Sequence, residues 1–220
     1  MIRISGPSHE KVARMIAIID YGMGNLLSVL KAFEHLGEEA RVIATPARLA
    51  DATHVVLPGV GAFPDAMAAL TKNGWVDALQ REVVEGGKPF LGVCLGMQLL
   101  AEFGEENVHC SGLAWIRGGV RRFVLNPKQY KVPHVGWNEI TPVDDSLLFR
   151  GLGPGATFYF VHSYHMICED KTDIAAYCDY GYPFPAAIRR GNIFATQFHP
   201  EKSQDNGLKV LENFLAYRGA

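Results

Sequence analysis

A single cysteine stands between two glycines in the segment Gly92-Val93-Cys94-Leu95-Gly96. The apolar run 89–93 before it is typical of a buried strand, and residues 95–101 after it have the pattern of a helix. A strand that turns sharply into a helix at a Gly-x-nucleophile-x-Gly elbow lifts the central side chain clear of the sheet. The free N–H groups and positive end of the following helix also favour a thiolate there. The pattern predicts that Cys94 is a nucleophile.

A thiolate that attacks a carbonyl needs a base to carry a proton and a third group to orient that base. The segment Phe198-His199-Pro200-Glu201 offers both directly after the strand expected at 193–197. Ligands of parallel α/β sheets collect at the carboxyl ends of the strands, where Cys94 also emerges. We therefore expect Cys94, His199 and Glu201 to meet, although a lone histidine in a loop more often has only a structural role.

The loop Pro58-Gly59-Val60-Gly61 follows another expected strand, 54–57, and its two glycines let the backbone approach a substrate closely. A peptide N–H of this loop, together with that of Leu95, would form an oxyanion hole, in which one donor contributes about 2.7–4 kcal/mol. A plain strand-to-helix turn is the alternative interpretation.

The elements around these residues alternate between strand and helix in the first half of the chain. A parallel sheet covered on both faces follows from that alternation. From about residue 113 short strands with turn signals predict an antiparallel extension on the same core. The fold class is therefore one α/β domain with a mostly parallel central sheet. Strands are expected at 15–20, 40–43, 54–57, 89–93, 157–161, 174–178, 186–189 and 193–197, and helices at 25–35, 62–85, 95–101 and 207–215.

The 220 residues are enough for one domain with a sizeable core, and 48% of them are hydrophobic. A net charge of -2 without a basic stripe gives no footprint for nucleic acid or a membrane surface, and no apolar run reaches the ~20 residues of a membrane helix. Residues 1–14 are expected to be an extension outside a domain that spans 15–220. Neither a metal site nor a cofactor is expected.

Four cysteines lack zinc-ligand or Cys-x-x-Cys spacing, and the chain starts without a signal-peptide pattern. A reducing, cytoplasmic compartment is therefore expected, in which Cys94 stays a free thiol. Cys110, Cys168 and Cys178 are interpreted as small apolar filling residues.

Taken together, the elbow, the loop at 58–61 and the His-Pro-Glu segment resemble the class I, or triad, glutamine amidotransferases. The likeness covers the chain from Met15 onward. Within that family, four further segments resemble the glutaminase subunits of imidazole glycerol phosphate synthases, which act in histidine biosynthesis. These segments are 20–25 (DYGMGN), 134–138 (HVGWN), 159–164 (YFVHSY) and 197–203 (QFHPEKS).

The resemblance implies a chemistry. Cys94 would attack the carboxamide of L-glutamine to form a glutamyl thioester, while His199 protonates the departing ammonia and then activates water, and Glu201 holds the imidazole. Val60, Gly61 and Leu95 match the oxyanion-hole positions of the family. The positions that hold glutamine are matched by Gly61, Gln98, Glu106, Ser163 and Tyr164. For Gln98 and Glu106 a polar helix surface is the alternative.

The resemblance also implies a partner. In the family the ammonia passes into a (β/α)₈-barrel cyclase subunit, which makes imidazole glycerol phosphate and aminoimidazole carboxamide ribonucleotide, and the two subunits form a heterodimer. No acceptor domain is expected in this chain, so the cyclase would be a separate subunit. Asn25, Trp137, Tyr159 and Lys202 match positions at or near that interface. Trp137 and Tyr159 would alternatively be ordinary core aromatics.

Three other functions remain open on the sequence. The glutaminase could serve another acceptor, as in anthranilate, p-aminobenzoate or pyridoxal phosphate synthesis. A thiol hydrolase or peptidase on the same scaffold is a second alternative, although the papain-like signature around a cysteine is absent. A catalytically inactive binding module is the third, and the intact Cys-His-Glu set disfavours it.

Overall fold

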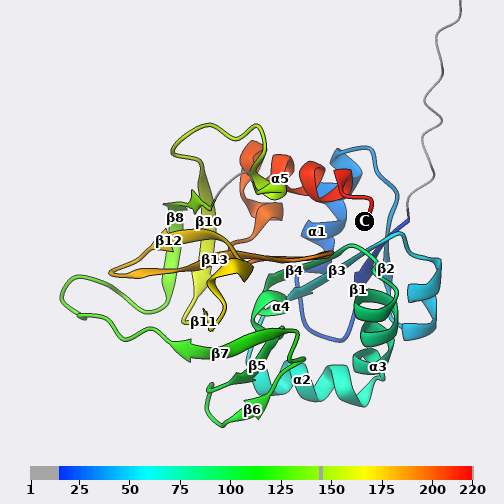
Figure 1. The fold of residues 1–220 in the computed structure, drawn as a ribbon, viewed down its shortest axis with the longest axis horizontal. Helices are drawn as coiled ribbons and strands as arrows, with labels where there is room; N and C mark the ends of the chain where they lie inside the picture. Colours follow the sequence, from blue (N-terminus) through cyan, green and yellow to red (C-terminus); the bar gives the residue numbers. More distant parts are fainter. Residues whose placement is uncertain (1–14, 144–145, 220) are drawn as a thin grey trace, which may run out of the picture.

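The computed structural model of the protein describes residues 15–143 and 146–219, and its centre is one eight-stranded sheet (Figure 1). The strand order is β2-β1-β3-β4-β14-β13-β12-β9. The first five strands run parallel and the last three pair antiparallel, so the expected α/β fold with an antiparallel extension is confirmed. The strands are β1 (Ile16–Ile19), β2 (Ala40–Ile43), β3 (His54–Gly59), β4 (Phe90–Cys94), β9 (Thr141–Pro142), β12 (Ile174–Asp179), β13 (Pro183–Arg190) and β14 (Ile193–Thr196).

Helices cover the parallel part of the sheet on both faces (Figure 1). Because strand residues alternate between faces, Ile16 and Ile18 pack in one cluster with α1 and α5. Ala17 and Ile19 pack in the other cluster with α2 and α3. This two-sided burial explains why β1 reads as a continuous apolar run. The helices are α1 (Leu26–His35), α2 (Phe63–Lys72), α3 (Trp75–Leu79), α4 (Leu95–Gln98) and α5 (Gln204–Ala216).

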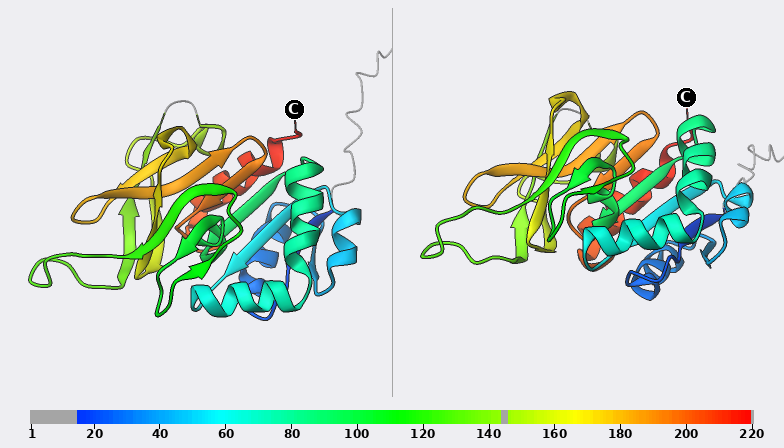
Figure 2. Two further views of the ribbon diagram at one scale, coloured as in Figure 1. Left: turned by 60° about the horizontal axis from the view of Figure 1, so that its bottom comes forward. Right: turned by 90° about the horizontal axis from the view of Figure 1, so that it is seen from below.

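Two smaller sheets extend the fold beside the antiparallel strands (Figure 2). The segment expected as a strand at 157–161 is confirmed as β10, but it pairs with β8 in a separate two-stranded sheet. A four-stranded sheet has the order β11-β7-β5-β6. Their bounds are β5 (Ala101–Gly104), β6 (Cys110–Ser111), β7 (Ile116–Arg122), β8 (His134–Glu139), β10 (Thr157–His162) and β11 (Tyr164–Cys168).

The prediction of a single helix at 62–85 is wrong, because the helix is interrupted at Gly74. This glycine has a φ of +72°, the left-handed conformation that commonly ends a helix. The chain then continues as α3 and a π-helical turn, Gln80–Glu85. Short 3₁₀ turns occur at Pro46–Asp51, Leu147–Phe149, Lys171–Asp173 and η5 (Pro200–Lys202).

The helix after Cys94 is also shorter than expected. α4 has four residues, and the chain turns into β5 at Ala101 instead of staying helical to that residue. The backbone N–H groups of Leu113, Trp115 and Ile116 donate to the carbonyls of Leu99 and Leu100, so tertiary pairing outweighs the helical pattern of the apolar residues. One turn sums few peptide dipoles, so the helix dipole supports the thiolate less than the sequence suggested.

Smaller differences lie at element ends. The strand expected at 54–57 continues to Gly59, and the helix expected at 207–215 begins at Gln204. Among the residues that the structure describes, no helix is long and apolar enough to cross a membrane. The extension expected at residues 1–14 lies outside the described residues.

Candidate active site

Cys94 ends the central strand β4, with β3 on one side and β14 on the other. Its φ of +55° is unusual for a residue with a side chain, as expected of a sharp elbow. The flanking glycines are required there, because a Cβ on Gly96 would lie 1.9 Å from the carbonyl oxygen of Leu57, and one on Gly92 would lie 2.6 Å from that of Gly96. The side chain is held on a tightly packed turn, and Cys94 is 7% exposed.

His199 and Glu201 follow β14, the strand next to β4, so they reach the same sheet edge as Cys94. His199 Nδ1 donates to Glu201 Oε1 at 2.8 Å, and both side chains are almost fully buried. The backbone is fixed as well, since His199 N–H donates to the carbonyl of Tyr159 at 3.0 Å. Among the described residues, His199 Nε2 has no hydrogen-bond partner, which leaves that nitrogen free for a proton transfer at the sulfur.

The charge of the histidine follows from its neighbours. Burial by itself lowers the pKa of His199. The Cys94 sulfur and the Glu201 carboxylate have a larger effect in the opposite direction, and the resulting pKa is raised to about 9. The ring is therefore an imidazolium at neutral pH, the form that can donate a proton from Nε2. By contrast, burial raises the pKa of the Cys168 and Cys178 thiols to about 12, so these two stay protonated.

An open cavity of about 340 Å³ lies in front of the sulfur. It brings together every residue that the sequence analysis gave to the catalytic, oxyanion-hole and glutamine-binding sets except Glu201, which lies behind His199. The lining residues are Val60, Gly61, Cys94, Leu95, Gln98, Glu106, Pro133, Val161, His162, Ser163, Tyr164 and His199.

The two polar residues with an alternative interpretation are not on a helix surface. Gln98 is in α4 but buried, and its Nε2 donates to the carbonyl of Tyr164 at 2.9 Å and to Gln197 Oε1 at 3.0 Å. Glu106 follows β5 in a loop, and its Oε2 accepts from the backbone N–H of Phe63 at 2.8 Å, at the start of α2. This contact anchors the carboxylate at the cavity wall.

The loop at 58–61 approaches the elbow closely. β3 pairs with β4 so that Gly59 lies opposite Cys94, and Gly61 has a φ of +108° that favours glycine. A Cβ on Gly59 would lie 2.4 Å from the Tyr21 hydroxyl and 3.0 Å from Leu95 Cβ. Burial and the nearby Cys94 both raise the pKa of Tyr21, whose hydroxyl has no partner among the described residues. The loop that contains Val60 is thus in close contact with Leu95 of the elbow.

The four residues expected at a partner interface lie on four neighbouring elements, α1, η5, β10 and β8. Asn25 caps α1, its Oδ1 accepting from the N–H of Ser28, and α1 contacts η5, which contains Lys202. Tyr159 and Trp137 pair across β10 and β8 with their ring centroids 6.1 Å apart. Trp137 is 48% exposed, so the core interpretation of this side chain is wrong.

Two buried histidines at or near the cavity, His162 and His134, were not predicted from the sequence. His162 lines the cavity, and its Nδ1 donates to the Tyr164 carbonyl at 2.8 Å. Its Nε2 therefore accepts from His134 Nδ1 at 3.1 Å. Burial lowers the pKa of His162 to about 3, and burial lowers that of His134 to about 4. The signal was present in the HVGWN and YFVHSY segments, whose histidines carried no assigned role.

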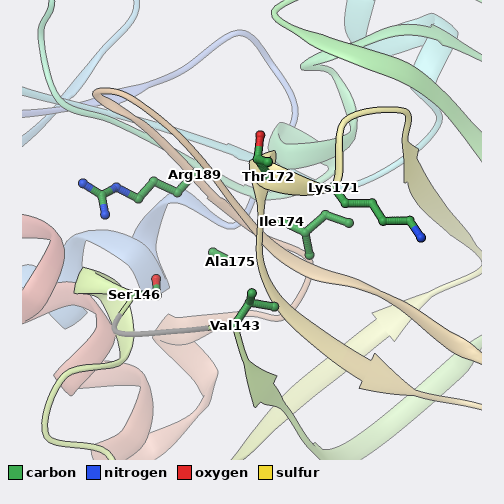
Figure 3. A pocket seen from close by; sticks show the side chains of 7 residues that line it. All are labelled: Val143, Ser146, Lys171, Thr172, Ile174, Ala175 and Arg189. Carbon is green, nitrogen blue, oxygen red and sulfur yellow. The ribbon is translucent and has the colours of Figure 1, made fainter.

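A larger cavity of about 530 Å³ lies elsewhere, near β12 and β13 (Figure 3). Its cationic side chains, Arg189 and Lys171, extend away from each other and do not converge on one point (Figure 3). The candidate nucleophile is not among its lining residues, so size does not identify the reactive site. No group of three metal-ligating side chains that could hold a metal ion occurs within residues 15–143 and 146–219.

Comparison with known proteins agrees with this geometry. The family described as Glutamine amidotransferase class-I matches residues 17–217. "Structure of PurLQS from Thermotoga maritima" has a chain with a TM-score of 0.73 at 17% identity, covering 94% of this chain and 99% of that one. A second solved structure, "Crystal structure of glutamine amidotransferase", gives a TM-score of 0.69 at 20% identity over 91% and 99% of the two chains. These structural likenesses define the class of fold.

Sequence relatives narrow the class. The imidazole glycerol phosphate synthase subunit HisH of Syntrophotalea carbinolica is 52% identical, over 91% of this chain and 98% of the relative. The subunit of the same name from Moorella thermoacetica is 50% identical, over 91% and 94% of the two chains. The chain therefore belongs to the HisH family of class I glutamine amidotransferases.

Proposed function

We propose that this protein hydrolyses L-glutamine to glutamate and ammonia as the glutaminase subunit of an imidazole glycerol phosphate synthase. The observation that carries the proposal is the set of Cys94, His199 and Glu201 at one sheet edge, with the 2.8 Å contact between His199 and Glu201. Relatives about 50% identical over most of the chain supply the acceptor reaction by their names.

In the first half of the proposed reaction, the Cys94 thiolate attacks the γ-carbonyl carbon of glutamine. Backbone N–H groups of Leu95 and of the loop at Val60 and Gly61 would stabilise the developing oxyanion. His199 then gives its Nε2 proton to the leaving nitrogen, the C–N bond breaks, and ammonia and a glutamyl thioester result.

In the second half, the now neutral His199 takes a proton from water, and the hydroxide attacks the thioester carbon. The C–S bond breaks, glutamate leaves, and the thiolate–imidazolium pair is restored. Glu201 accepts from Nδ1 and holds the ring, so that Nε2 faces the reacting atoms. Gln98, Glu106, Ser163 and Tyr164 would bind the substrate, with the Glu106 carboxylate placed to pair with its α-ammonium.

The proposed partner is a (β/α)₈-barrel cyclase that forms a heterodimer with this chain and makes imidazole glycerol phosphate and aminoimidazole carboxamide ribonucleotide. Apolar side chains at the cavity mouth support a partner there. Val60 lines the cavity and is 42% exposed, and Val135 and Trp137 of β8 are 56% and 48% exposed, close to the lining residue Pro133. Asn25, Tyr159 and Lys202 would complete this interface. We place the reaction in the cytoplasm, where Cys94 remains reduced.

A coupled assay tests the proposal. The protein is mixed with a cyclase subunit, glutamine and N′-phosphoribulosyl formimino aminoimidazole carboxamide ribonucleotide, and both glutamate and imidazole glycerol phosphate are measured. Cys94→Ala should lose glutamine turnover by several orders of magnitude, since the nucleophile is gone. Cys110→Ala, a change at a cysteine outside the cavity, should leave turnover unchanged.

Two outcomes would contradict the proposal in different ways. Glutamate release without imidazole glycerol phosphate would point to another ammonia acceptor. Full turnover by Cys94→Ala would remove the cysteine from the reaction. With ammonium salt in place of glutamine, the Cys94→Ala complex should still form imidazole glycerol phosphate, because the cyclase site is untouched.

A further inference from the structure

Gln197 connects the nucleophile to the glutamine-binding wall. It lies between β14 and His199, is fully buried, and its backbone N–H donates to the carbonyl of Ala186 at 2.8 Å. Its side-chain Oε1 accepts from Gln98 Nε2 at 3.0 Å, and its Nε2 donates to Cys94 Sγ at 3.8 Å. The sulfur therefore has a fixed N–H donor in addition to the nearby imidazolium.

Three hydrogen bonds connect Tyr164, Gln98, Gln197 and Cys94 in series, and one backbone carbonyl sets the direction of all three. The oxygen of Tyr164 can only accept, so the side-chain atom of Gln98 that faces it must be Nε2. The same nitrogen faces Gln197, so the atom of Gln197 on that side must be Oε1. The remaining end of the Gln197 amide, its Nε2, is then the end at the sulfur. Reversing either amide would place two acceptors or two donors against each other.

We infer that Gln197 is a positioning residue for the glutaminase reaction, an inference that rests on the proposed function. Its N–H stabilises the charged form of the sulfur more than the neutral thiol, because hydrogen bonds to ionised groups are the stronger ones. Its carbonyl holds Gln98 so that both N–H groups of that amide are used inside the protein. Gln98 thus presents only its acceptor oxygen to the cavity. This oxygen suits the N–H donor of the glutamine carboxamide and disfavours the carboxylate that glutamate has in its place.

Other titratable groups also face the sulfur or its cavity. His199 and Tyr21 interact electrostatically with Cys94, from the segment after β14 and from the end of β1. His162 and Glu106 line the same cavity from β10 and from the loop after β5. A test must therefore change the Gln197 amide alone and leave these groups in place.

Two variants separate the two ends of the amide. Gln197→Glu keeps an acceptor for Gln98 but replaces the donor at the sulfur by a negative acceptor. Gln197→Met has a similar shape and removes both hydrogen bonds. Gln80→Glu adds the same charge at an exposed position of the π-helical turn and is the matched control.

The first readout is the rate at which iodoacetamide alkylates Cys94, followed against pH by mass spectrometry of the Cys94 peptide in the full-length protein. The midpoint of this profile should rise by about one pH unit or more in Gln197→Glu, corresponding to the loss of about one charge-assisted hydrogen bond. It should rise by a smaller amount in Gln197→Met and stay at the wild-type value in Gln80→Glu.

The second readout is glutamine turnover in the complex with the cyclase subunit. Gln197→Glu should lower kcat with KM retained, whereas Gln197→Met should also raise KM, because Gln98 loses one anchor. An alkylation midpoint in Gln197→Glu equal to the wild-type value would overturn the inference. If that variant does not fold by circular dichroism, an unchanged midpoint in Gln197→Met has the same meaning.

The two readouts also separate this inference from the proposed function. Alkylation needs neither glutamine nor a partner. Absence of glutamine turnover by the wild-type complex would therefore refute the proposed function, whereas the midpoints report only on the groups at the sulfur.

Discussion

Two buried histidines line one cavity, and one is charged at neutral pH while the other is neutral. His199 is held by the Glu201 carboxylate and lies beside the Cys94 sulfur, and its pKa is raised to about 9 against the effect of burial. His162 is held by a backbone carbonyl, and burial lowers its pKa to about 3. Burial alone does not decide the charge of an imidazole. The neighbouring groups do, because the Cys94 sulfur and the Glu201 carboxylate compensate a positive His199 ring, whereas the Tyr164 carbonyl compensates a positive His162 ring only weakly.

The neutral side of this comparison is a cluster. His134 donates to His162, and His165 Nε2 accepts from the Tyr182 hydroxyl at 2.9 Å. Burial lowers the pKa of His165 as well, and the nearby charge of His199 contributes to lowering that of His162. The cavity therefore has one charged imidazole, that of His199, and one neutral imidazole, that of His162, at neutral pH.

The largest expected effect is a difference in glutamine turnover between variants of His199 and of His162. His199→Ala should lower the glutamine turnover of the complex by about 10²–10⁴-fold, the usual contribution of a general acid–base group. His162→Gln, whose amide can still donate to the Tyr164 carbonyl, should change turnover by less than about tenfold, because a neutral ring is not needed for proton transfer. Steady-state assays of both variants check this, and an equal loss in both would break the comparison.

A pH titration of stability is the next test. The folded-state pKa values of His134 and His162, about 4 and 3, lie below the ordinary value of 6.5. Stability from keeping these rings neutral is present above pH 6.5 and is lost as the pH falls towards the folded-state values. Each histidine contributes a slope of up to ~1.4 kcal/mol per pH unit. Urea unfolding between pH 6.5 and 5.5 should show this fall.

The control for the titration is His162→Gln. Its free energy of unfolding should depend less steeply on pH than that of the wild type, by the contribution of one histidine. Because the carboxylates titrate mainly at lower pH, the chosen range isolates the histidines. The same slope in the variant and the wild type would mean that His162 is already charged when folded.

The smallest effect is expected at the edge of the neutral cluster. Tyr182→Phe removes the hydroxyl that donates to His165 and should lower the free energy of unfolding by about 0.5–1.5 kcal/mol, the net value of one hydrogen bond. Glutamine turnover should stay unchanged, since Tyr182 is not among the cavity-lining residues. Urea unfolding at pH 7 with a parallel activity assay checks both, and a loss of turnover would extend the reactive site into this cluster.

The parts of the site that the sequence predicted depend on local chain geometry. The glycines around Cys94 and the two-residue spacing of His199 and Glu201 both describe how a few consecutive residues leave a strand end. The same local reading gave the apolar strands of the parallel sheet, which are buried on both faces.

The missed parts depend on contacts between distant segments. Gln98 meets Tyr164 across 66 residues, and His134 meets His162 across 28. No local pattern states which amide or ring a carbonyl will orient. The predicted length of the helix after Cys94 was wrong for the same reason. Leu99 and Leu100 fit a helical pattern, but their carbonyls accept from residues 113–116 instead.

The position of β14 sets the order in which this catalyst becomes complete. β14 is the last strand along the chain, yet it lies between β4 and β13 in the middle of the sheet. The donor at the sulfur comes from 103 residues beyond Cys94. A nascent chain that has not yet delivered its final strand thus has the thiol but lacks its base, its orienting carboxylate and its amide donor. The reactive site is therefore incomplete until the residues that follow β14 are in place.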